Sequence, residues 1–359
     1  MASKVRVEAR EPDTWADSLT HSRSVFVSFV PLWFHLPLFA LVSLGGLERR
    51  GLLPHVAAMK LLVVLGLAWA VVWSARSAAV LPLSEKDFKG TGRCLLASHG
   101  FVPSPNSERA INDSVQKLIE RHQDAFGFKA KPDFRLRIRI FGKFQDYTNV
   151  ALNLYFTNAL ERRAYADQMI HVAGFYSPPT REIITWQQEA PGVLGHTLLH
   201  EASHAIMDAH YDNIPLWLLE GSAEYFAYTQ LSPPDERHLF VLRETWTSLN
   251  RWLKEGQLVP FHTLLNADAA AFKQLNQEKA YAESWILFQV LVQSEPNRRA
   301  MFGLLRERQD PSGPDLLATE QLARLYPGGL KRLEADWLTR IRAGSSNTNA
   351  PDAKFRRVN

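Results

Sequence analysis

Cysteine is nearly absent from this sequence, since Cys94 is the only one in 359 residues. A single cysteine excludes both an intramolecular disulfide framework and a zinc site built from several thiolates. Any bound metal must therefore be held by histidine and carboxylate side chains. A strong excess of one charge is also missing, because 41 lysines and arginines stand against 37 aspartates and glutamates and leave a net charge of +4. So small an excess does not make a basic nucleic-acid-binding surface, and we expect no nucleic-acid partner.

Two apolar runs lie in the first hundred residues. One covers residues 25–47 with few interruptions, and the second covers residues 61–73. Both approach the roughly 20 apolar residues that a helix needs to cross a bilayer. We therefore interpret residues 1–83 as a membrane or signal region with one or two hydrophobic helices.

Two interpretations of this region remain open. A helical hairpin would place both chain ends on one side of the membrane, and the lysines and arginines outside residues 48–50 then favour the cytoplasmic face. Alternatively, translation starts at Met59, and residues 59–79 have the three parts of a secretory signal peptide. We favour a membrane-associated protein with its folded domain outside the cytoplasm, and keep the cytoplasmic face of the inner membrane as the alternative.

The sequence after residue 84 begins with mixed helix and strand patterns. Helical spacing of apolar residues predicts a helix that Ser107 caps and that ends near Gly127. Apolar residues then alternate with Arg135, Arg137 and Arg139, which predicts a strand whose arginine face is solvated. Residues 169–176 and 181–186 predict two strands joined by a turn, and thus a hairpin.

From residue 193 onward the pattern is helical. We expect helices over residues 194–210, 216–229, 234–255 and 279–294, with further helices up to about residue 343. The polar residues 344–359 predict a disordered tail. The predicted fold class is therefore α+β: a small β-sheet subdomain with an edge hairpin over residues 84–192, then a mostly helical subdomain over residues 193–343.

A short segment at the junction of the two subdomains has the spacing of a metal site. His200 and His204 are four residues apart on a predicted helix, so their imidazoles project from one face towards a common point. Glu201, next to them, can take a proton from a metal-activated water and pass it to the leaving group. The flanking residues are apolar, which predicts a helix that is buried enough to hold its ligands in place.

Zinc needs a third protein ligand, and two downstream residues are candidates. His210 fits the metzincin spacing, except that Met207 replaces the glycine at which the chain leaves the helix. An unbroken helix would turn His210 away from His204, so His210 is the weaker alternative. Glu220 is the stronger candidate and lies in the segment Trp217-Leu218-Leu219-Glu220-Gly221.

The two segments together resemble those of gluzincins, the zinc metallopeptidases that include thermolysin, the zinc aminopeptidases and the bacterial peptidase-MA-like domains. The resemblance implies a zincin-like helical subdomain, a bound Zn²⁺, and hydrolysis of peptide bonds with Glu201 as general base. It maps the third zinc ligand onto Glu220. It also maps onto Glu224, one turn later, a carboxylate that binds no metal itself but orients a ligand histidine. The sequence departs from the aminopeptidase pattern at Leu219, where those enzymes have asparagine.

The resemblance covers about residues 130–345. The predicted hairpin is similar to the edge strands before the metal helix, where an extended peptide can add as a further strand. Residues 279–285 resemble a later helix, in which Tyr281 would hydrogen-bond the oxyanion as a tyrosine does in the zinc aminopeptidases. A half-buried core tyrosine is the alternative for Tyr281. For His196, one turn before His200, we expect a structural or supporting role, and we expect His171 and His262 on the surface or in loops.

Three functions remain open on the sequence alone. The first is a membrane-associated zinc metallopeptidase that acts on a peptide or protein. The second is a membrane-tethered peptide-binding or scaffold protein with this fold and little turnover, although a purely structural zinc needs no base such as Glu201. The third is a zinc hydrolase of a non-peptide amide, which would use the same residues. The sequence does not indicate the oligomeric state, the substrate, or whether a peptidase of this kind would cleave at the ends of a peptide or within it.

Overall fold

The computed structural model describes residues 84–344, apart from residues 91, 157, 167–168, 170–171, 189–191, 231–235 and 311–315. Both predicted apolar segments lie outside the described residues, as does the predicted tail after residue 344. Within the described part of the chain, no helix is long and apolar enough to cross a membrane. The membrane segments within residues 1–83 therefore stay a prediction.

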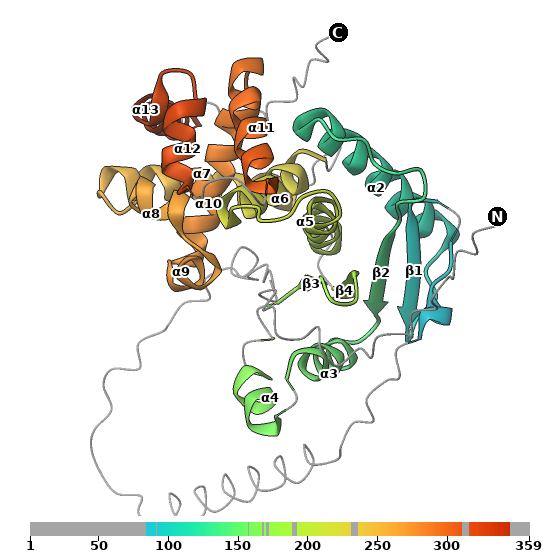
Figure 1. Ribbon diagram of the computed structural model, residues 1–359. Coiled ribbons are helices and arrows are strands. Elements are labelled where there is room, and N and C mark those ends of the chain that lie inside the picture. Colours follow the sequence, from blue (N-terminus) through green and yellow to red (C-terminus); the bar gives the residue numbers. More distant parts are fainter. Residues whose placement is uncertain are drawn as a thin grey trace, which may run out of the picture.

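The fold is α+β, with a small mixed sheet followed by helices (Figure 1). The first part contains η3 (Glu85–Asp87), β1 (Cys94–His99), α2 (Pro105–Phe126), β2 (Leu136–Phe141), α3 (Phe144–Tyr155), α4 (Ala159–Ala166), β3 (Gly174–Ser177) and β4 (Glu182–Trp186). All later described elements are helices: α5 (Val193–Asp208), α6 (Leu216–Gln230), α7 (Glu236–Lys254), α8 (Phe261–Asn266), α9 (Ala269–Gln274), α10 (Gln277–Val292), α11 (Glu295–Gln309), α12 (Ala318–Leu325) and α13 (Gly329–Gly344).

The sheet has four strands in the order β1-β2-β4-β3. Strands β1, β2 and β4 are parallel, and β3 pairs antiparallel with β4 at one edge. The predicted hairpin is confirmed, with Ser177 opposite Glu182 beside its turn. Strand β1 was not predicted because it lies in a stretch that is interrupted by glycine and proline. The hairpin leaves β3 as an edge strand that contacts α5, the helix that carries His200.

Helix α2 begins earlier than the sequence predicted. Its N-cap is Ser104, whose side chain accepts a hydrogen bond from the backbone N–H of Ser107, and Pro105 occupies the first turn. Proline is favoured there because the N–H it lacks would have no helical partner. The predicted end at Gly127 is confirmed, since this residue closes the helix with a left-handed φ of 72°.

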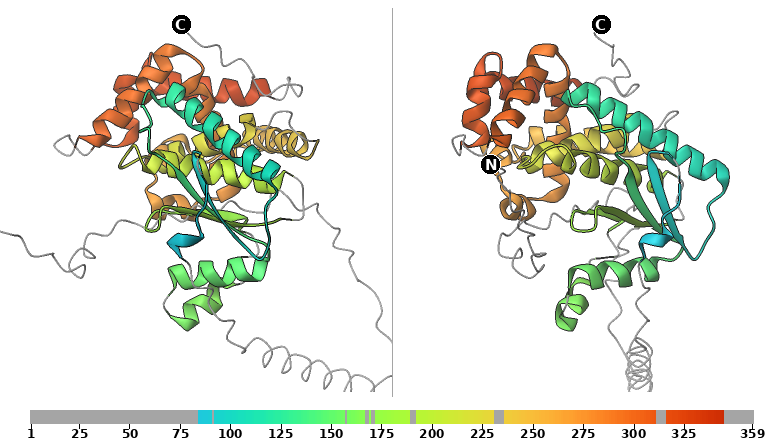
Figure 2. Two further views of the ribbon diagram at one scale, coloured as in Figure 1. Left: turned by 90° about the vertical axis from the view of Figure 1, so that its right-hand side faces the viewer. Right: turned by 45° about the vertical axis from the view of Figure 1, so that its right-hand side comes forward.

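The two faces of the sheet contact different helices (Figure 2). Ile138, Ile183 and Tyr176 belong to the main apolar core, to which α2 and α5 also contribute. Phe141 and Phe175 belong to a second core, to which α3 contributes. Alternate residues of a strand point to opposite faces, so this division follows from the sequence of each strand. We call the face that meets α3 the lower face of the sheet.

The prediction of a solvated arginine face is wrong for Arg139. Its side chain is only 1% exposed, and its guanidinium pairs with Glu182 at 2.8 Å and with Asp87 at 3.1 Å. Arg137 pairs with Glu182 as well, and the Phe88 ring lies over both guanidinium groups. Arg139 is buried because η3 and Phe88 cover this part of the lower face.

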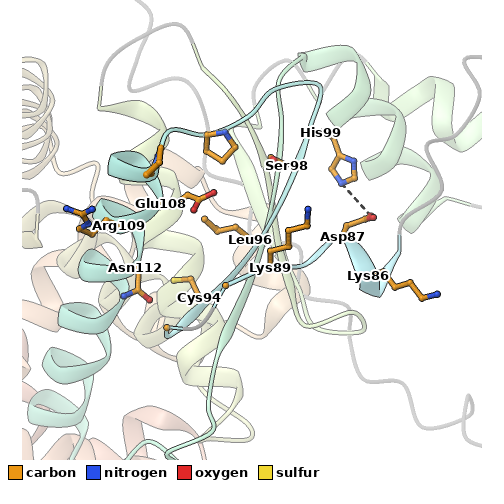
Figure 3. A pocket seen from close by; sticks show the side chains of 14 residues that line it. Lys86, Asp87, Lys89, Cys94, Leu96, Ser98, His99, Glu108, Arg109 and Asn112 are labelled. Atoms are coloured by element: carbon orange, nitrogen blue, oxygen red, sulfur yellow. Dashed lines mark ion pairs between the residues drawn. The ribbon is translucent and has the colours of Figure 1, made fainter.

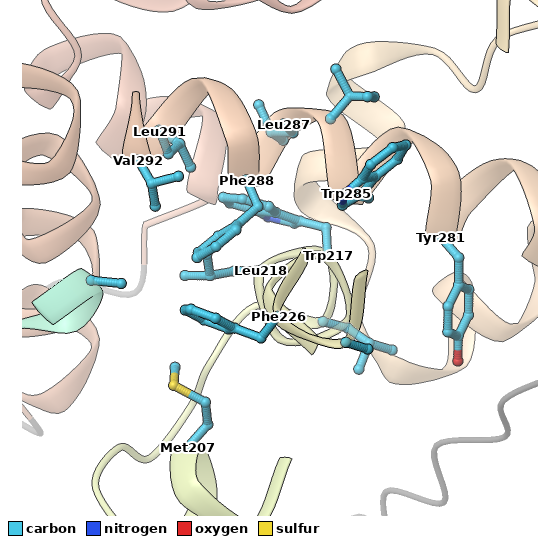
Figure 4. Packing of buried hydrophobic residues seen from close by; sticks show 14 of the residues in the cluster. Met207, Trp217, Leu218, Phe226, Tyr281, Trp285, Leu287, Phe288, Leu291 and Val292 are labelled. Atoms are coloured by element: carbon cyan, nitrogen blue, oxygen red, sulfur yellow. The ribbon is translucent and has the colours of Figure 1, made fainter. Parts of the chain in front are cut away.

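Helices α6 and α10 pack closely in the helical part. Their shared core includes Trp217 and Phe226 from α6 and Phe288 from α10 (Figure 4). Gly221 allows the close approach, because a Cβ added there would lie 2.3 Å from the backbone oxygen of Ser284. This contact between α6 and α10 also sets the position of Glu220, the neighbour of Gly221, relative to α5.

Replacing Gly221 by alanine is expected to destabilise the protein. The added methyl group must push α6 away from the α10 backbone, and overpacking of this kind costs about 1–3 kcal/mol. Thermal unfolding followed by circular dichroism should show a clearly lower midpoint. Gly303→Ala is the matched control, because the Cβ there meets only the end of the flexible Leu325 side chain, 2.8 Å away. Equal midpoints for Gly221→Ala and the parent protein would contradict the close contact.

Candidate metal centre

Two consecutive helices carry the predicted metal ligands. His200 and His204 lie on α5, and Glu220 lies on α6. The chain between the helices turns tightly, as predicted from its Asp, Asn and Pro residues. Asn213 adopts a left-handed φ of 50°, a conformation that asparagine tolerates better than most residues. This turn brings the start of α6 back beside the ligand-bearing face of α5.

The structure brings His200, His204 and Glu220 together. One ligand atom from each lies within 4.8 Å of the others, and all three residues are buried. The Nε2 atoms of His200 and His204 lie 3.4 and 3.5 Å from the same carboxylate oxygen, Oε2 of Glu220. The three side chains therefore converge on one small volume.

The spacing of these atoms fits a shared metal ion. Ligands bound to tetrahedral zinc at about 2.0–2.1 Å are separated from each other by about 3.3–3.4 Å. Charge-assisted hydrogen bonds between nitrogen and carboxylate would be shorter, at about 2.7–2.9 Å. The observed 3.4 and 3.5 Å match the first geometry better. Two histidines and a glutamate are also a donor set of catalytic zinc sites, although other divalent transition metals accept the same donors.

The electrostatics of the group favour the protonation states that bind a metal. Burial lowers the pKa of His200 to about 4, so its imidazole is neutral at physiological pH. Burial alone would raise the pKa of Glu220, but His204 and His200 outweigh it and lower this pKa to about 2. A neutral imidazole and an ionised carboxylate are the forms that coordinate zinc.

Glu201 lies on α5, against the edge strand β3, and is fully buried. Its Oε2 accepts a hydrogen bond of 2.7 Å from the backbone N–H of Tyr176 in β3, while its Oε1 makes no hydrogen bond with the described residues. Burial raises the pKa of Glu201 well above its usual value, with a further rise from Glu220 and Glu224 and an opposing effect of the Tyr176 N–H. A carboxylate with one oxygen held and a raised pKa is suited to accept a proton.

Glu224 and His196 lie on the other side of His200. Oε1 of Glu224 is 3.4 Å from Nδ1 of His200, and Oε2 is 3.8 Å from Nε2 of His196. Burial, with repulsion from Glu220, raises the pKa of Glu224 to about 8. These three residues also have the spacing of a metal site, but it would use the ring nitrogen of His200 that faces away from Glu220. Glu224 stands where a carboxylate can orient the His200 ring, and His196 lies behind it.

Tyr281 lies beside the His–Glu group and also belongs to the main apolar core. Its ring is nearly parallel to that of His200, with centroids 6.4 Å apart and 15° between the planes. Figure 4 shows its hydroxyl pointing away from the apolar cluster of Phe226 and Phe288. The residue is buried, and its ring lies near that of His200.

His210 does not join the group. Its Nδ1 lies 2.8 Å from the backbone oxygen of Ile206, and its ring stacks on Phe128 at a centroid distance of 4.0 Å. The sequence predicted a helix that continues through residue 210, but α5 ends at Asp208, and the turn after it does not bring His210 back to the group. His262 is exposed, as expected, and His171 lies outside the described residues.

The sequence did not reveal the part that Tyr176 and Asp208 play. Besides the N–H bond to Glu201, the Tyr176 hydroxyl donates a 2.8 Å hydrogen bond to Asp208 at the end of α5. Gly174 allows this close approach, since a Cβ there would lie 2.7 Å from Cγ2 of Thr197. A backbone donor has no signature in the sequence. The glycine before an aromatic residue in an edge strand was the one available signal.

A surface pocket of about 560 Å³ lies elsewhere, between β1 and the first turns of α2 (Figure 3). Its lining mixes the cations Lys86, Lys89 and Arg109 with Asp87 and Glu108. None of the residues of the His–Glu group lines it. The pocket therefore does not contribute to the candidate metal centre.

No protein-family model matches this sequence, and no curated protein matches it either. The likeness to gluzincins therefore rests on the two quoted segments. The convergence of His200, His204 and Glu220 is an observation independent of that likeness.

Proposed function

We propose that this protein is a zinc-dependent metallopeptidase in which His200, His204 and Glu220 hold the metal. The observation that carries the proposal is the convergence of these three side chains at the separations of zinc ligands, with the buried carboxylate of Glu201 beside them. A structural zinc site has no use for that fourth group. Membrane association through residues 1–83 belongs to the same proposal.

Zinc bound here would lower the pKa of a water molecule and polarise the scissile carbonyl. Glu201 then accepts the proton on Oε1, while the Tyr176 N–H holds Oε2 in place, and later delivers the proton to the leaving nitrogen. The Tyr281 hydroxyl donates to the oxyanion that develops on the carbonyl. Glu224 orients the His200 ring through Nδ1, so that Nε2 faces His204 and Glu220.

The edge strand favours a peptide as substrate over another amide. Antiparallel pairing leaves the backbone groups of alternate β3 residues at the free edge. The N–H of Tyr176 is already bonded to Glu201 there, so a peptide would use the remaining groups of this edge. An extended peptide can use such an edge for main-chain hydrogen bonds. Non-peptide amides without an extended backbone gain nothing from it.

A scaffold protein without turnover is the rival function. Burying Glu201 with one oxygen unpartnered costs stability, because a buried polar group without a hydrogen bond loses its hydration. A scaffold would gain nothing in return. Glutamine at this position would be the cheaper residue, and the chain has glutamate.

Alanine at Glu220 is expected to lower zinc affinity by at least about 100-fold, because loss of an outer partner alone costs 10–100-fold. His210→Ala is the matched control and should leave zinc affinity unchanged. Zinc content by mass spectrometry and competition with a chromophoric chelator measure both. The opposite order of the two variants would show metzincin geometry and contradict the ligand set proposed here.

The Glu201→Gln variant should keep its zinc and lose activity. Glutamine has the same shape but cannot take a proton, and general base catalysis contributes about 10²–10⁴-fold. Hydrolysis of labelled casein and of a library of internally quenched peptides measures the loss, with zinc content and unfolding midpoint as controls for folding. Undiminished hydrolysis by the glutamine variant would refute the role of Glu201. A zinc-loaded parent protein that cleaves none of these substrates would support the scaffold.

The Tyr281→Phe variant tests whether the Tyr281 hydroxyl donates a hydrogen bond to the oxyanion. Loss of one such donor typically lowers kcat by about 10²–10³-fold, and here KM and zinc content should stay the same. Steady-state kinetics on the best peptide from the library separate the two constants. If kcat is unchanged and only the unfolding midpoint falls, Tyr281 is a core residue.

A further inference from the structure

The described chain begins at a point that is fixed to the lower face of the sheet. Ser84 caps η3, and the two acidic residues of η3 pair with the arginines of β2: Glu85 with Arg137 at 2.7 Å, and Asp87 with Arg139 at 3.1 Å. The Phe88 ring lies over both guanidinium groups, with centroid distances of 4.4 and 4.6 Å. The chain therefore enters the folded domain from the lower face.

Helix α3 lies on this same face, next to the entry point. Phe141 follows Arg139 by two residues on β2, so both side chains point downwards, and Phe141 packs with Tyr147 of α3. His99 connects η3 with the residues that pack on α3. Its ring stacks on Phe141 at a centroid distance of 4.9 Å, and its Nε2 lies 3.9 Å from Asp87 (Figure 3). Both ribbon figures place α3 and α4 at one end of the molecule, with α11 to α13 at the other.

Exposed hydrophobic side chains gather on this end. Five large hydrophobic residues are exposed in the described part of the chain. Three of them belong to α3 and α4: Leu154 at 36%, Leu160 at 78% and Tyr165 at 38%. Two exposed cations, Lys143 at the N-cap of α3 and Arg163 on α4, outnumber the exposed carboxylate of Glu161 on α4. Leucine, tyrosine and basic side chains together are the composition of a membrane-interface surface.

The length of the preceding chain restricts what this end can face. The apolar run of residues 61–73 ends 11 residues before Ser84. An extended chain of that length spans at most about 40 Å. A run that enters a bilayer would hold the lower face of the sheet within this distance of the lipid.

We propose that the α3–α4 lobe rests on the membrane surface, with Leu160 in the headgroup region and Arg163, three residues later on the same face of α4, near anionic lipid. The inference rests on the membrane association proposed above, through residues 61–73, and not on the proposed metal centre. The main core with α5 lies on the other face of the sheet, so the lipid-facing lobe and the His–Glu group do not overlap.

Site-specific fluorescence on the full chain tests this orientation. Leu160→Cys and, as the matched control, Leu317→Cys are each labelled with an environment-sensitive nitrobenzoxadiazole group and placed in nanodiscs of phosphatidylcholine and phosphatidylglycerol. Leu317 is 53% exposed and directly precedes α12, at the opposite end of the molecule. Burial raises the pKa of Cys94 to about 12, so this thiol does not compete for the label.

The label at residue 160 should emit at shorter wavelength and lose most of its fluorescence to lipids that carry a nitroxide near the headgroup. The label at residue 317 should do neither. Equal quenching at both sites, or at neither, would overturn the proposal. A blue shift at residue 160 that appears only with two chains in each nanodisc would assign the lobe to a second copy and overturn it as well. Zinc content measured on the same samples separates this result from any failure of the proposed metal centre.

Discussion

Three carboxylates buried between the same helices are the constraint on which the rest of the structure depends. Glu201, Glu220 and Glu224 are all buried, and two of them have raised pKa values because burial and mutual repulsion disfavour the ionised form. Charges of one sign in a low-dielectric site are tolerated only with a compensating partner. His200, whose pKa burial lowers to about 4, does not supply that charge at physiological pH. A divalent cation at the point where His200, His204 and Glu220 converge would supply it, and this is the physical content of the proposed zinc site.

The surrounding fold brings these groups together through close backbone contacts. Gly221 lets α6 lie against α10, next to Glu220, and Gly174 lets β3 lie against α5, next to Glu201. Large aromatic side chains, Trp217 among them, fill the helical core behind α6 and hold the helix in register. The metal ligands are thus carried by rigid helices, while the base is held by a backbone N–H of the edge strand. Because Glu201 and the two histidines belong to the same helix, this arrangement also fixes the base relative to the ligands.

Local patterns were enough to predict much of this from the sequence. The four-residue spacing of His200 and His204, the turn before Leu216 and the hairpin were all predicted, because each follows from short-range periodicity or turn chemistry. The burial of Arg139 was missed because it depends on η3, a segment about fifty residues earlier that the pattern of β2 does not contain. The hydrogen bond from Tyr176 to Glu201 was missed for a similar reason, since a backbone donor between distant elements leaves no mark on residue spacing.

We propose that His200, His204 and Glu220 share one zinc ion. Crystals of the zinc-supplied protein, measured on both sides of the zinc absorption edge, would reveal it. We expect an anomalous peak about 2.0–2.2 Å from Nε2 of each histidine and from an oxygen of Glu220. A well-ordered structure with no anomalous peak among these side chains, or with the zinc bound at His210, would contradict it.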